Sequence, residues 1–221
     1  MASAEGAPGA DGRPPGDPRR RLAVLASGTG TILEALLAAG LPIVVVGVDR
    51  PCRAAGIAAA GGIPVEFVAR EDFSPAFDRE AYTEALLAAL RRHRVGTVAM
   101  AGFATVLSPG FFPAFDGRVL NTHPSLLPAY RGWRAVPMAL AAGETTTGCT
   151  VHLATSEVDE GPVLAQERVP IHPGDTEETL HERIKEVERR LYPATVRSFL
   201  ASTEETAGGI AAPEDPEVMG R

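Results

Sequence analysis

The sequence predicts an α/β domain built on a doubly wound, mostly parallel sheet with helices on both faces. Three observations predict this fold class. Short apolar runs rich in β-branched residues alternate with stretches of helical spacing, each run is almost continuously apolar, and polar motifs follow several of the runs. Strands that are apolar on both sides are typical of a parallel sheet covered by two layers of helices. Ligands of such sheets bind beyond the carboxyl ends of the strands, so we expect the site there.

The alternation predicts the elements in order along the chain. The expected strands are Leu22–Ala26, Ile43–Val48, Val65–Val68, Thr97–Ala101, Val119–Thr122, Thr147–Leu153 and Val163–Val169. The expected helices are Ile32–Ala39, Arg53–Ala60, Asp78–His93 and a long closing helix, Glu177–Leu200. The third helix has the clearest periodicity, with Tyr82, Leu86 and Leu90 at helical intervals. Thr176 is a suitable N-cap for the last helix.

The two ends of the chain differ in composition from the rest. Residues 1–20 and 203–221 are rich in Gly, Pro and polar side chains and show no apolar periodicity. Segments of this kind cannot bury enough apolar surface to order themselves. We therefore expect a disordered N-terminal arm at 1–20, one folded domain at 21–202 and a disordered C-terminal tail at 203–221.

Composition narrows the class of partner and the compartment. The chain has 221 residues with 45% hydrophobic content, which suits one domain with a sizeable core. A net charge of −7 argues against a nucleic-acid partner, because binding to phosphate backbones needs a basic face. Two cysteines, Cys52 and Cys149, give no disulfide framework. The apolar runs are too short for a membrane span, and no signal peptide is recognisable. We expect a cytoplasmic protein with small-molecule partners and no membrane association.

The first polar motif, Ser27–Thr31, lies between the first strand and the first helix. Its sequence Ser-Gly-Thr-Gly-Thr allows a tight turn, and the free amides at a helix N-terminus favour an anion such as phosphate. A Gly-x-Gly turn with a purely structural role is the alternative. Leu33 occupies the third glycine position of the dinucleotide pattern, and Asp49 is the only acidic candidate for a ribose ligand. The motif therefore favours a monophosphate.

The second motif, Asn121–Pro128, follows the fifth strand and has the sequence Asn-Thr-His-Pro-Ser-Leu-Leu-Pro. Asn121 and His123 have the same strand parity, so their side chains point to the same face. A histidine can carry protons near neutral pH, and an asparagine amide can donate to an oxyanion. A histidine with its hydrogen bonds satisfied inside a turn is the alternative. Ser125 lacks the sequence context of a nucleophilic serine, and we expect it to be a turn residue.

The third motif, Val158–Pro162, contains two acidic residues in a loop between the last two strands. Such a segment is commonly a solvated turn. A functional role requires Asp159 to face His123, where a carboxylate would fix the histidine tautomer. A zinc site would need Cys149 and His152 together with His123, but the ligand spacing is absent and Cys149 and His152 should point to opposite faces of their strand. We therefore expect no metal.

Together these motifs resemble the folate-dependent formyltransferase family over about residues 22–200. Asn121–Pro128 followed at a distance by Asp159 carries the resemblance, because the catalytic set of the family is an Asn–His–Asp trio. Three further stretches are similar to the branch that formylates glycinamide ribonucleotide: Gly148–His152, Asp159–Pro162 and Leu180–Lys185. The resemblance implies a formyltransferase fold with a Rossmann-like N-terminal half, in a single domain at 21–202.

By this resemblance the chain is expected to be an enzyme of purine biosynthesis. It would transfer the formyl group of its co-substrate 10-formyltetrahydrofolate to the amine of 5-phosphoribosylglycinamide. The products would be N-formylglycinamide ribonucleotide and tetrahydrofolate, with no metal required. The expected partners are these small molecules, and the expected state is a monomer or a homodimer.

The resemblance also assigns roles to individual residues. Catalysis is assigned to Asn121, His123 and Asp159, with His123 as the proton donor and Asp159 raising its pKa. The ribonucleotide phosphate is assigned to Gly30, Thr31 and Ile32, with Lys185 and Glu188 close to the ribonucleotide. The folate is assigned to Arg79, Ala104, Thr105, Val106, Leu107 and Asn121.

Two departures from the family pattern leave the acceptor open. Ile32 stands where the family commonly has asparagine, and an isoleucine side chain cannot donate to phosphate. The segment Tyr130–Trp133 looks more like relatives that formylate tRNA or sugars. The first alternative is therefore a formyltransferase for another primary amine, such as an amino sugar. The second is a protein of another class, which binds folate or a nucleotide without catalysis.

Overall fold

The computed structural model describes residues 17–207 and folds them around one mixed sheet. The strands are β1 (Leu22–Ala26), β2 (Ile43–Val48), β3 (Val65–Phe67), β4 (Thr97–Met100), β5 (Val119–His123), β6 (Thr146–Leu153) and β7 (Val163–Pro170). The α-helices are α1 (Thr31–Ala38), α2 (Arg53–Ala60), α3 (Arg79–Arg92), α4 (Ala135–Ala141) and α5 (Glu177–Ala207). Short 3-10 helices occupy Pro18–Arg20 (η1), Pro109–Phe111 (η2) and Pro113–Phe115 (η3).

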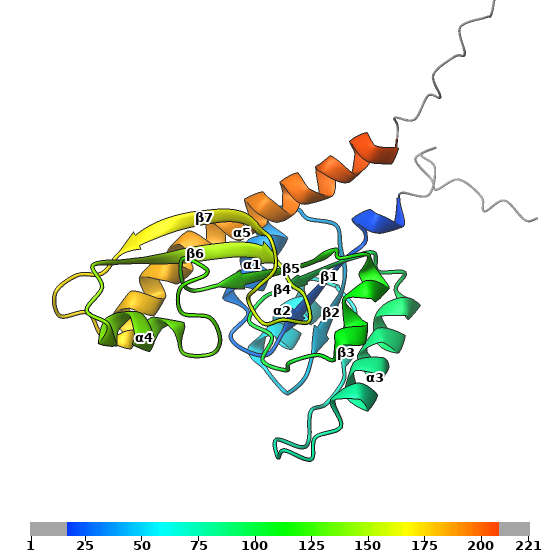
Figure 1. The fold of residues 1–221 in the computed structure, drawn as a ribbon. Helices are drawn as coiled ribbons and strands as arrows, with labels where there is room; N and C mark the ends of the chain where they lie inside the picture. The colour runs from blue at the N-terminus through cyan, green and yellow to red at the C-terminus, as the bar shows by residue number, and fades with distance from the viewer. Residues whose placement is uncertain (1–16, 208–221) are drawn as a thin grey trace, which may run out of the picture.

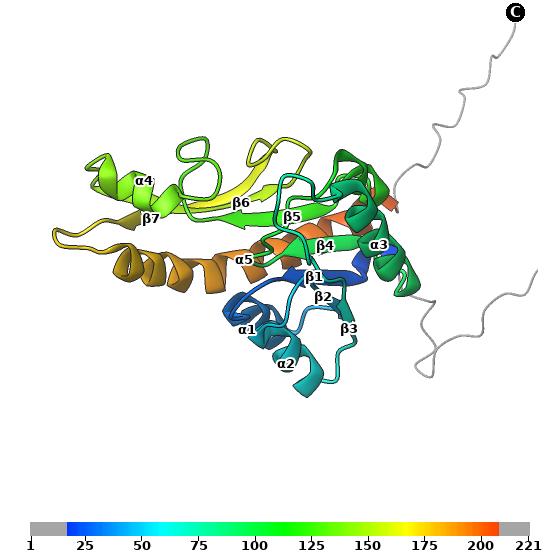
Figure 2. The same cartoon turned by 90° about the horizontal axis from the view of Figure 1, so that it is seen from below.

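The sheet has seven strands in the order β3-β2-β1-β4-β5-β6-β7. β1 to β5 are parallel, whereas β6 is antiparallel to β5 and β7 is antiparallel to β6. Helices cover both faces (Figures 1 and 2). The predicted doubly wound, mostly parallel sheet is thus confirmed. The strand order reverses between β1 and β4, which is where sheets of this kind form a ligand crevice.

Strand alternation divides the core into two layers. Leu22 and Val24 of β1 face one side, where α1, α2 and the C-terminal half of α5 pack. Ala23 and Leu25 face the other side, where α3 and the 3-10 helices η2 and η3 pack. Because successive side chains of a strand point to opposite faces, an apolar five-residue run such as β1 is buried on both sides. A third cluster joins α4, β6, β7 and the first turns of α5.

The structure differs from the sequence-based expectation in a few elements. α4 was not expected; it is only seven residues long, and its Pro137 lies in the first turn, where a helix accepts proline. α5 continues to Ala207 rather than ending at Leu200, so the first residues of the expected tail are helical. Residues 208–221 of that tail lie outside the described residues. Among the described residues, no helix has both the length and the apolar character of a membrane span.

The expected N-terminal arm also differs at its end. Residues 1–16 lie outside the described residues, but η1 follows them and contacts the folded body. The carbonyl oxygen of Arg19 accepts hydrogen bonds from Thr97 Oγ1 at 2.5 Å and from Arg118 at 3.1 Å. A Cβ on Gly96 would lie 2.3 Å from the Pro18 carbonyl oxygen, so only glycine permits this approach. The two ends of the described chain, η1 and the end of α5, lie close together (Figure 1).

The long helix α5 is fixed to the centre of the sheet through a buried tyrosine. Tyr192 is fully buried, and its hydroxyl donates to the carbonyl oxygen of Leu120 in β5 at 2.9 Å. Tyr192→Phe should therefore lower the free energy of unfolding by about 1 kcal/mol, since it removes one buried hydrogen bond. Urea denaturation measures the change. Tyr130→Phe is the matched control, because its hydroxyl bonds exposed Glu144 and its loss should change stability by less than about 0.5 kcal/mol. Equal stability of Tyr192→Phe and the parent protein would contradict this account.

Candidate active site

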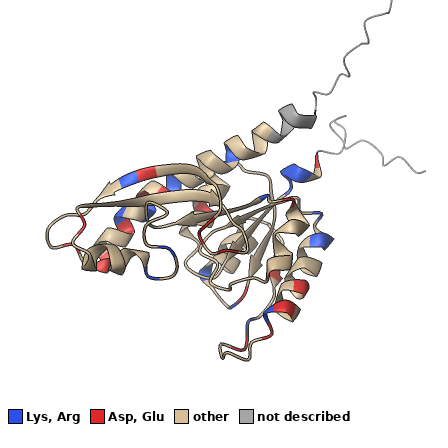
Figure 3. Ribbon diagram, in the orientation of Figure 1, with Lys and Arg blue, Asp and Glu red and all other residues tan. Residues whose placement is uncertain are grey.

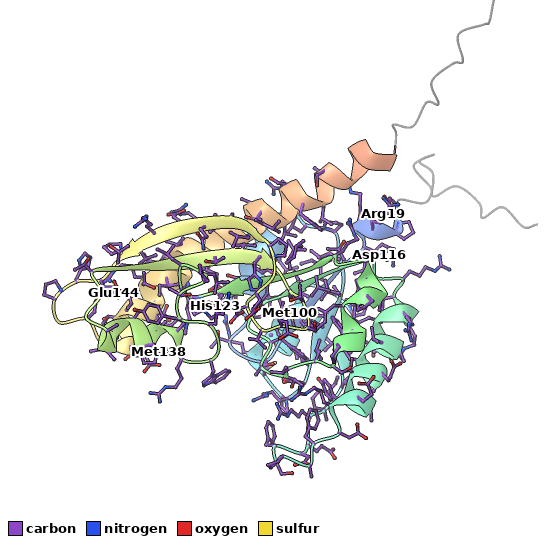
Figure 4. The ribbon with its side chains drawn as sticks, viewed as in Figure 1. Arg19, Met100, Asp116, His123, Met138 and Glu144 are labelled. Atoms are coloured by element: carbon purple, nitrogen blue, oxygen red, sulfur yellow. The ribbon has the colours of Figure 1, made fainter. Side chains whose placement is uncertain are left out.

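The predicted polar motifs meet at the carboxyl edge of the sheet. Asn121 and His123 lie at the end of β5 and project to the same face, as strand alternation predicts. The antiparallel pairing of β6 places His152 opposite Asn121 and Thr150 opposite His123. His123 lies near the middle of the molecule (Figure 4). The sheet therefore brings an asparagine and two histidines together on one face.

Asp159 joins this group from the loop between β6 and β7. Its Oδ2 lies 3.2 Å from His123 Nδ1, and its Oδ1 lies 3.4 Å from His152 Nε2. The Nε2 atom of His152 is also 3.2 Å from the amide nitrogen of Asn121. His123 and Asp159 are both buried. We call these four residues, Asn121, His123, His152 and Asp159, the catalytic cluster, after the role that the sequence resemblance predicts for three of them.

The position of Asp159 is fixed by its own loop. Asp159 has a left-handed φ of 56°, and its Oδ2 accepts from the backbone amide of Gly132 at 2.8 Å. Gly161 has no room for a side chain, because a Cβ there would lie 1.7 Å from the Leu153 carbonyl oxygen. The Asp-x-Gly pattern is thus explained by a close approach of the loop to β6.

Asp159 is held in its ionised form. Burial opposes ionisation, but hydrogen bonds from His152 and the Gly132 amide, with the nearby charges of both histidines, outweigh burial and keep the pKa of Asp159 below its ordinary value. The carboxylate of Asp159 thus lies between two imidazole rings and can accept a hydrogen bond from each of them.

The segment Tyr130–Trp133, which departs from the family pattern, belongs structurally to this cluster. The carbonyl oxygen of Tyr130 lies 2.8 Å from His123 Nε2, and a carbonyl can only accept, so this nitrogen donates. Arg131 forms an ion pair with Glu160 at 2.6 Å. Tyr130 and Gly132 both have left-handed φ angles, of 54° and 83°. Trp133 then projects outward and is 88% exposed.

A cavity of ≈ 230 Å³ lies beside the catalytic cluster, where the first motif meets α5. Its lining residues come from the β1–α1 loop, the ends of β4 and β5, and α5: Gly28, Thr29, Thr31, Ile32, Ala101, Gly102, Thr122, Pro124, His181, Lys185 and Glu188. Thr122 and Pro124 flank His123 in the chain, so the cavity and the cluster are neighbours. The cavity brings together Thr31, Ile32, Lys185 and Glu188, which are far apart in sequence.

The β1–α1 turn has the geometry of an anion site. Gly30 has a left-handed φ of 76°, and a Cβ there would lie 2.6 Å from Ile57 Cδ1, so glycine is required. Gly30 is the N-cap of α1 and makes no side-chain cap hydrogen bond. The first amides of the helix are therefore available to an anion in the cavity. Ile32 adds only apolar surface, whereas Lys185 and His181 supply N–H groups from the opposite wall.

Glu188 has an unusual environment in the wall of this cavity. Burial raises its pKa to about 7, and this exceeds the opposing effects of a hydrogen bond to Thr122 and of the charges of Lys185 and Arg189. A protonated or poorly solvated carboxyl can exchange hydrogen bonds with hydroxyl groups of a ligand. Glu188 thus supplies a polar group that suits a sugar more than a second phosphate.

The residues expected to bind folate are only partly brought together. Ala104–Leu107 forms an irregular segment after β4, at the same sheet edge as Asn121, and Val106 is exposed. Arg79 begins α3, and its exposed side chain forms no ion pair with another described residue. A dinucleotide site is not formed, because the buried carboxylate of Asp49 is occupied by Arg50 and Thr105.

The other sequence candidates have structural surroundings of their own. Cys149 faces Thr122 and α5, whereas His152 faces Asn121, so the two lie on opposite faces of β6 as predicted. Burial raises the pKa of the Cys149 thiol to about 12. Ser125 is buried and donates to the Ala129 carbonyl oxygen at 2.6 Å, the turn role we expected. Within residues 17–207, no group of three or more His, Cys, Asp or Glu side chains is arranged to hold a metal ion.

Two members of the site were not identified from the sequence. His152 was considered as a metal ligand and as part of a similar stretch, and His181 only as part of a similar stretch. The strand register that places His152 opposite Asn121 would have revealed the first. His181 precedes Lys185 by one helical turn, and this spacing is the signal that would have revealed the second.

Comparison with known proteins identifies relatives of the whole folded part. The formyl transferase family model matches residues 20–196. A phosphoribosylglycinamide formyltransferase of Mycobacterium tuberculosis is 51% identical over 191 residues, covering 84% of this chain and 87% of that protein. A human trifunctional purine biosynthetic protein adenosine-3 is 36% identical over 199 residues, covering 84% of this chain but 19% of that longer protein. The crystal structure of a phosphoribosylglycinamide formyltransferase from Bacillus halodurans matches with a TM-score of 0.77 at 33% identity, covering 86% of this chain and 100% of that one.

Glu188 predicts a pH dependence of stability. Its pKa is about 7 in the folded state against an ordinary value of 4.5, so the folded state binds the proton more tightly. The protein therefore loses stability as pH rises from 4.5 through about 7. Glu188→Gln removes this loss. We compare the free energy of unfolding of the variant with that of the parent at each pH. The difference should favour the variant by about 1–3 kcal/mol more at pH 8 than at pH 4.5.

Urea denaturation at the two pH values measures this difference. Glu186→Gln is the matched control, because Glu186 lies on the same helix but is exposed. It should show no such pH-dependent gain. A Glu188→Gln variant whose stability difference from the parent is the same at both pH values would contradict the assignment.

Proposed function

Because the chain belongs to the formyl transferase family, we propose that it transfers the formyl group of 10-formyltetrahydrofolate to the amine of 5-phosphoribosylglycinamide in purine biosynthesis. The observation that carries the proposal is the catalytic cluster of Asn121, His123, His152 and Asp159 next to a cavity with an anion-binding turn. The name of the mycobacterial relative, at 51% identity, supports the same reaction.

The catalytic cluster supplies the groups that this reaction needs. Attack of an amine on the formyl carbon develops negative charge on the formyl oxygen, and a proton must reach the departing nitrogen. An amide nitrogen has two N–H donors, so the side chain of Asn121 can donate to the oxyanion. His123 Nε2 donates to the Tyr130 carbonyl oxygen in the free protein, and the same N–H can be offered to substrate when that oxygen moves aside. Asp159, whose Oδ2 lies 3.2 Å from His123 Nδ1, would keep the ring oriented.

The cavity suits a phosphorylated amine despite Ile32. The amides at the start of α1 and the side chains of Lys185 and His181 supply donors around the position where the family commonly has asparagine. A hydrogen bond to a charged group is worth roughly 1.5–3 kcal/mol, so one such donor can offset the loss of the amide. Glu188 would bind the ribose hydroxyls. Gly30, Thr31 and Ile32 would form the floor of the phosphate site.

The folate would bind at the edge of the sheet beyond β4 and β5. Arg79, Asn121 and the segment Ala104–Leu107 would contact it, with Arg79 facing its anionic end. Lys and Arg residues lie among Asp and Glu residues along α3, α5 and β7 (Figure 3), which suits small ligands better than nucleic acid. The reaction requires no metal. We further propose that the enzyme acts in the cytoplasm as a monomer or a homodimer.

The reaction itself is tested with His123→Ala in a formyl-transfer assay. The parent protein should transfer the formyl group from 10-formyltetrahydrofolate to 5-phosphoribosylglycinamide, and the variant should lose about 10²–10⁴-fold in kcat. Glucosamine and its 6-phosphate serve as alternative acceptors in parallel. Turnover of the parent with an amino sugar but not with 5-phosphoribosylglycinamide would overturn the acceptor. Folate binding without turnover of any amine would overturn the enzyme assignment.

The Asp159–His123 pair predicts a change in the pH profile. Asp159→Asn removes the negative charge 3.2 Å from His123 Nδ1, so the protonated ring loses its partner. We expect kcat to fall by roughly 10–10³-fold and the basic limb of the pH–rate profile, where His123 would lose its proton, to move to lower pH. Glu157→Gln, an exposed change in the same loop, is the control and should leave the profile unchanged. An Asp159→Asn profile that overlays the parent profile would show that the pair has no catalytic role.

A further inference from the structure

Behind the segment expected to bind folate lies a buried carboxylate. Asp49 lies just beyond the end of β2 and is 1% exposed. None of the substrate contacts proposed above involves it. It lies in the same layer as Ser27, which follows β1, and as Thr105, which follows β4. The polar side chains that follow three neighbouring strands, β1, β2 and β4, thus lie together behind the segment Ala104–Leu107.

Both oxygens of this carboxylate are engaged. Arg50 donates from Nε to Oδ1 and from a terminal nitrogen to Oδ2, both at 3.0 Å. Thr105 Oγ1 donates to Oδ2 at 2.7 Å. Burial opposes ionisation, but hydrogen bonds from Arg50, Thr105 and Ser27 outweigh it and keep the pKa of Asp49 below its ordinary value. Asp49 is therefore an anion in a fixed position, and its hydrogen bond from Thr105 fixes that side chain.

The remaining residues of the segment are anchored around one exposed position. The amide of Ala104 donates to Ser27 Oγ at 2.8 Å, and the amide of Ser108 donates to Thr83 Oγ1 at 2.9 Å. Leu107 is buried in the core beneath α3. Val106 alone projects outward, with 49% of its surface exposed. Because its neighbours in the loop are hydrogen-bonded or buried, Val106 is exposed at a well-defined position.

The Thr105 side chain does not itself face a ligand. It is 2% exposed, and its only hydroxyl proton is donated to Asp49. Thr105 can therefore contact a bound molecule only through its backbone, whose position the side chain determines. Tyr82 adds to the enclosure, because its buried hydroxyl lies close enough to Thr105 and Asp49 to interact with both.

We propose that Asp49 is a positioning residue that fixes the Thr105–Val106 backbone against the pteridine and benzoyl portion of the folate substrate. This rests on the proposed folate-dependent function. The carboxylate acts through Thr105 and does not touch the reacting atoms. Its loss should let the segment open, so that the folate binds more weakly while the amine substrate and the catalytic cluster are unaffected.

The matched pair Thr105→Val and Thr105→Ser tests the proposal without disturbing the Asp49–Arg50 ion pair. Valine keeps the shape of threonine but cannot donate, whereas serine keeps the donor. We expect Thr105→Val to raise KM for 10-formyltetrahydrofolate about 10-fold, with kcat and KM for the amine within about 2-fold of the parent values. Thr105→Ser should restore KM to within about 2-fold. A merely structural role would lower the thermal midpoint and the apparent kcat but leave KM unchanged.

Asp49→Asn and the double variant Asp49→Asn/Thr105→Val complete a double-mutant cycle with Thr105→Val. If Asp49 acts through Thr105, the double variant should raise KM for folate no more than the larger single effect. Additive effects, or an unchanged KM in Thr105→Val, would overturn the proposal. Should Asp49→Asn fail to fold, the Thr105 pair decides alone.

Hydrogen exchange separates this proposal from the proposed function. The amides of residues 101–108 should exchange faster in Thr105→Val than in Thr105→Ser, with or without turnover. Absence of formyl transfer by the parent protein would contradict the proposed function. Equal exchange in the two variants would overturn the anchoring of the segment by Asp49.

Discussion

The pairing of β6 with β5 is the constraint on which the candidate active site depends. Parallel strands alone would align Asn121 and His123 at the sheet edge, but would bring no second strand back across them. Because β6 runs antiparallel, it places His152 directly opposite Asn121. The loop that follows then returns Asp159 to within 3.4 Å of both imidazole rings. A shift of one residue in this register would turn His152 towards α5 and separate the cluster.

Three carboxyl groups near the sheet edge show how surroundings set their roles. Asp49 and Asp159 are buried but receive several hydrogen bonds, so both have lowered pKa values and remain anionic. Glu188 receives fewer, and burial raises its pKa to about 7. The first two can fix a threonine and a histidine, whereas the third can take up or release a proton in the wall of the cavity. In the roles that we propose, the same chemical group would serve for positioning, for catalysis and for contact with a ligand.

Most of the fold and the centre of the site could be predicted from the sequence. The apolar runs identified each strand, and strand parity placed Asn121 and His123 together because it depends only on local geometry. The pairing of β6 with β5 is non-local, so the role of His152 could not be read from spacing. The same reason applies to Asp49. The sequence offered it only as a candidate for a ribose ligand in a dinucleotide site that we did not favour, because its partner Thr105 is 56 positions away in the chain. α4 was missed because its seven residues are too few to give a clear helical periodicity.

The account predicts that both substrates meet over the catalytic cluster. A crystal structure with a stable folate analogue and 5-phosphoribosylglycinamide tests this most directly. We expect the phosphate at the first amides of α1, close to Lys185 and His181, and the position of the formyl oxygen within hydrogen-bond distance of Asn121 Nδ2 and His123 Nε2. A phosphate bound away from the Gly28–Ile32 turn, or a formyl position distant from His123, would contradict the central claim.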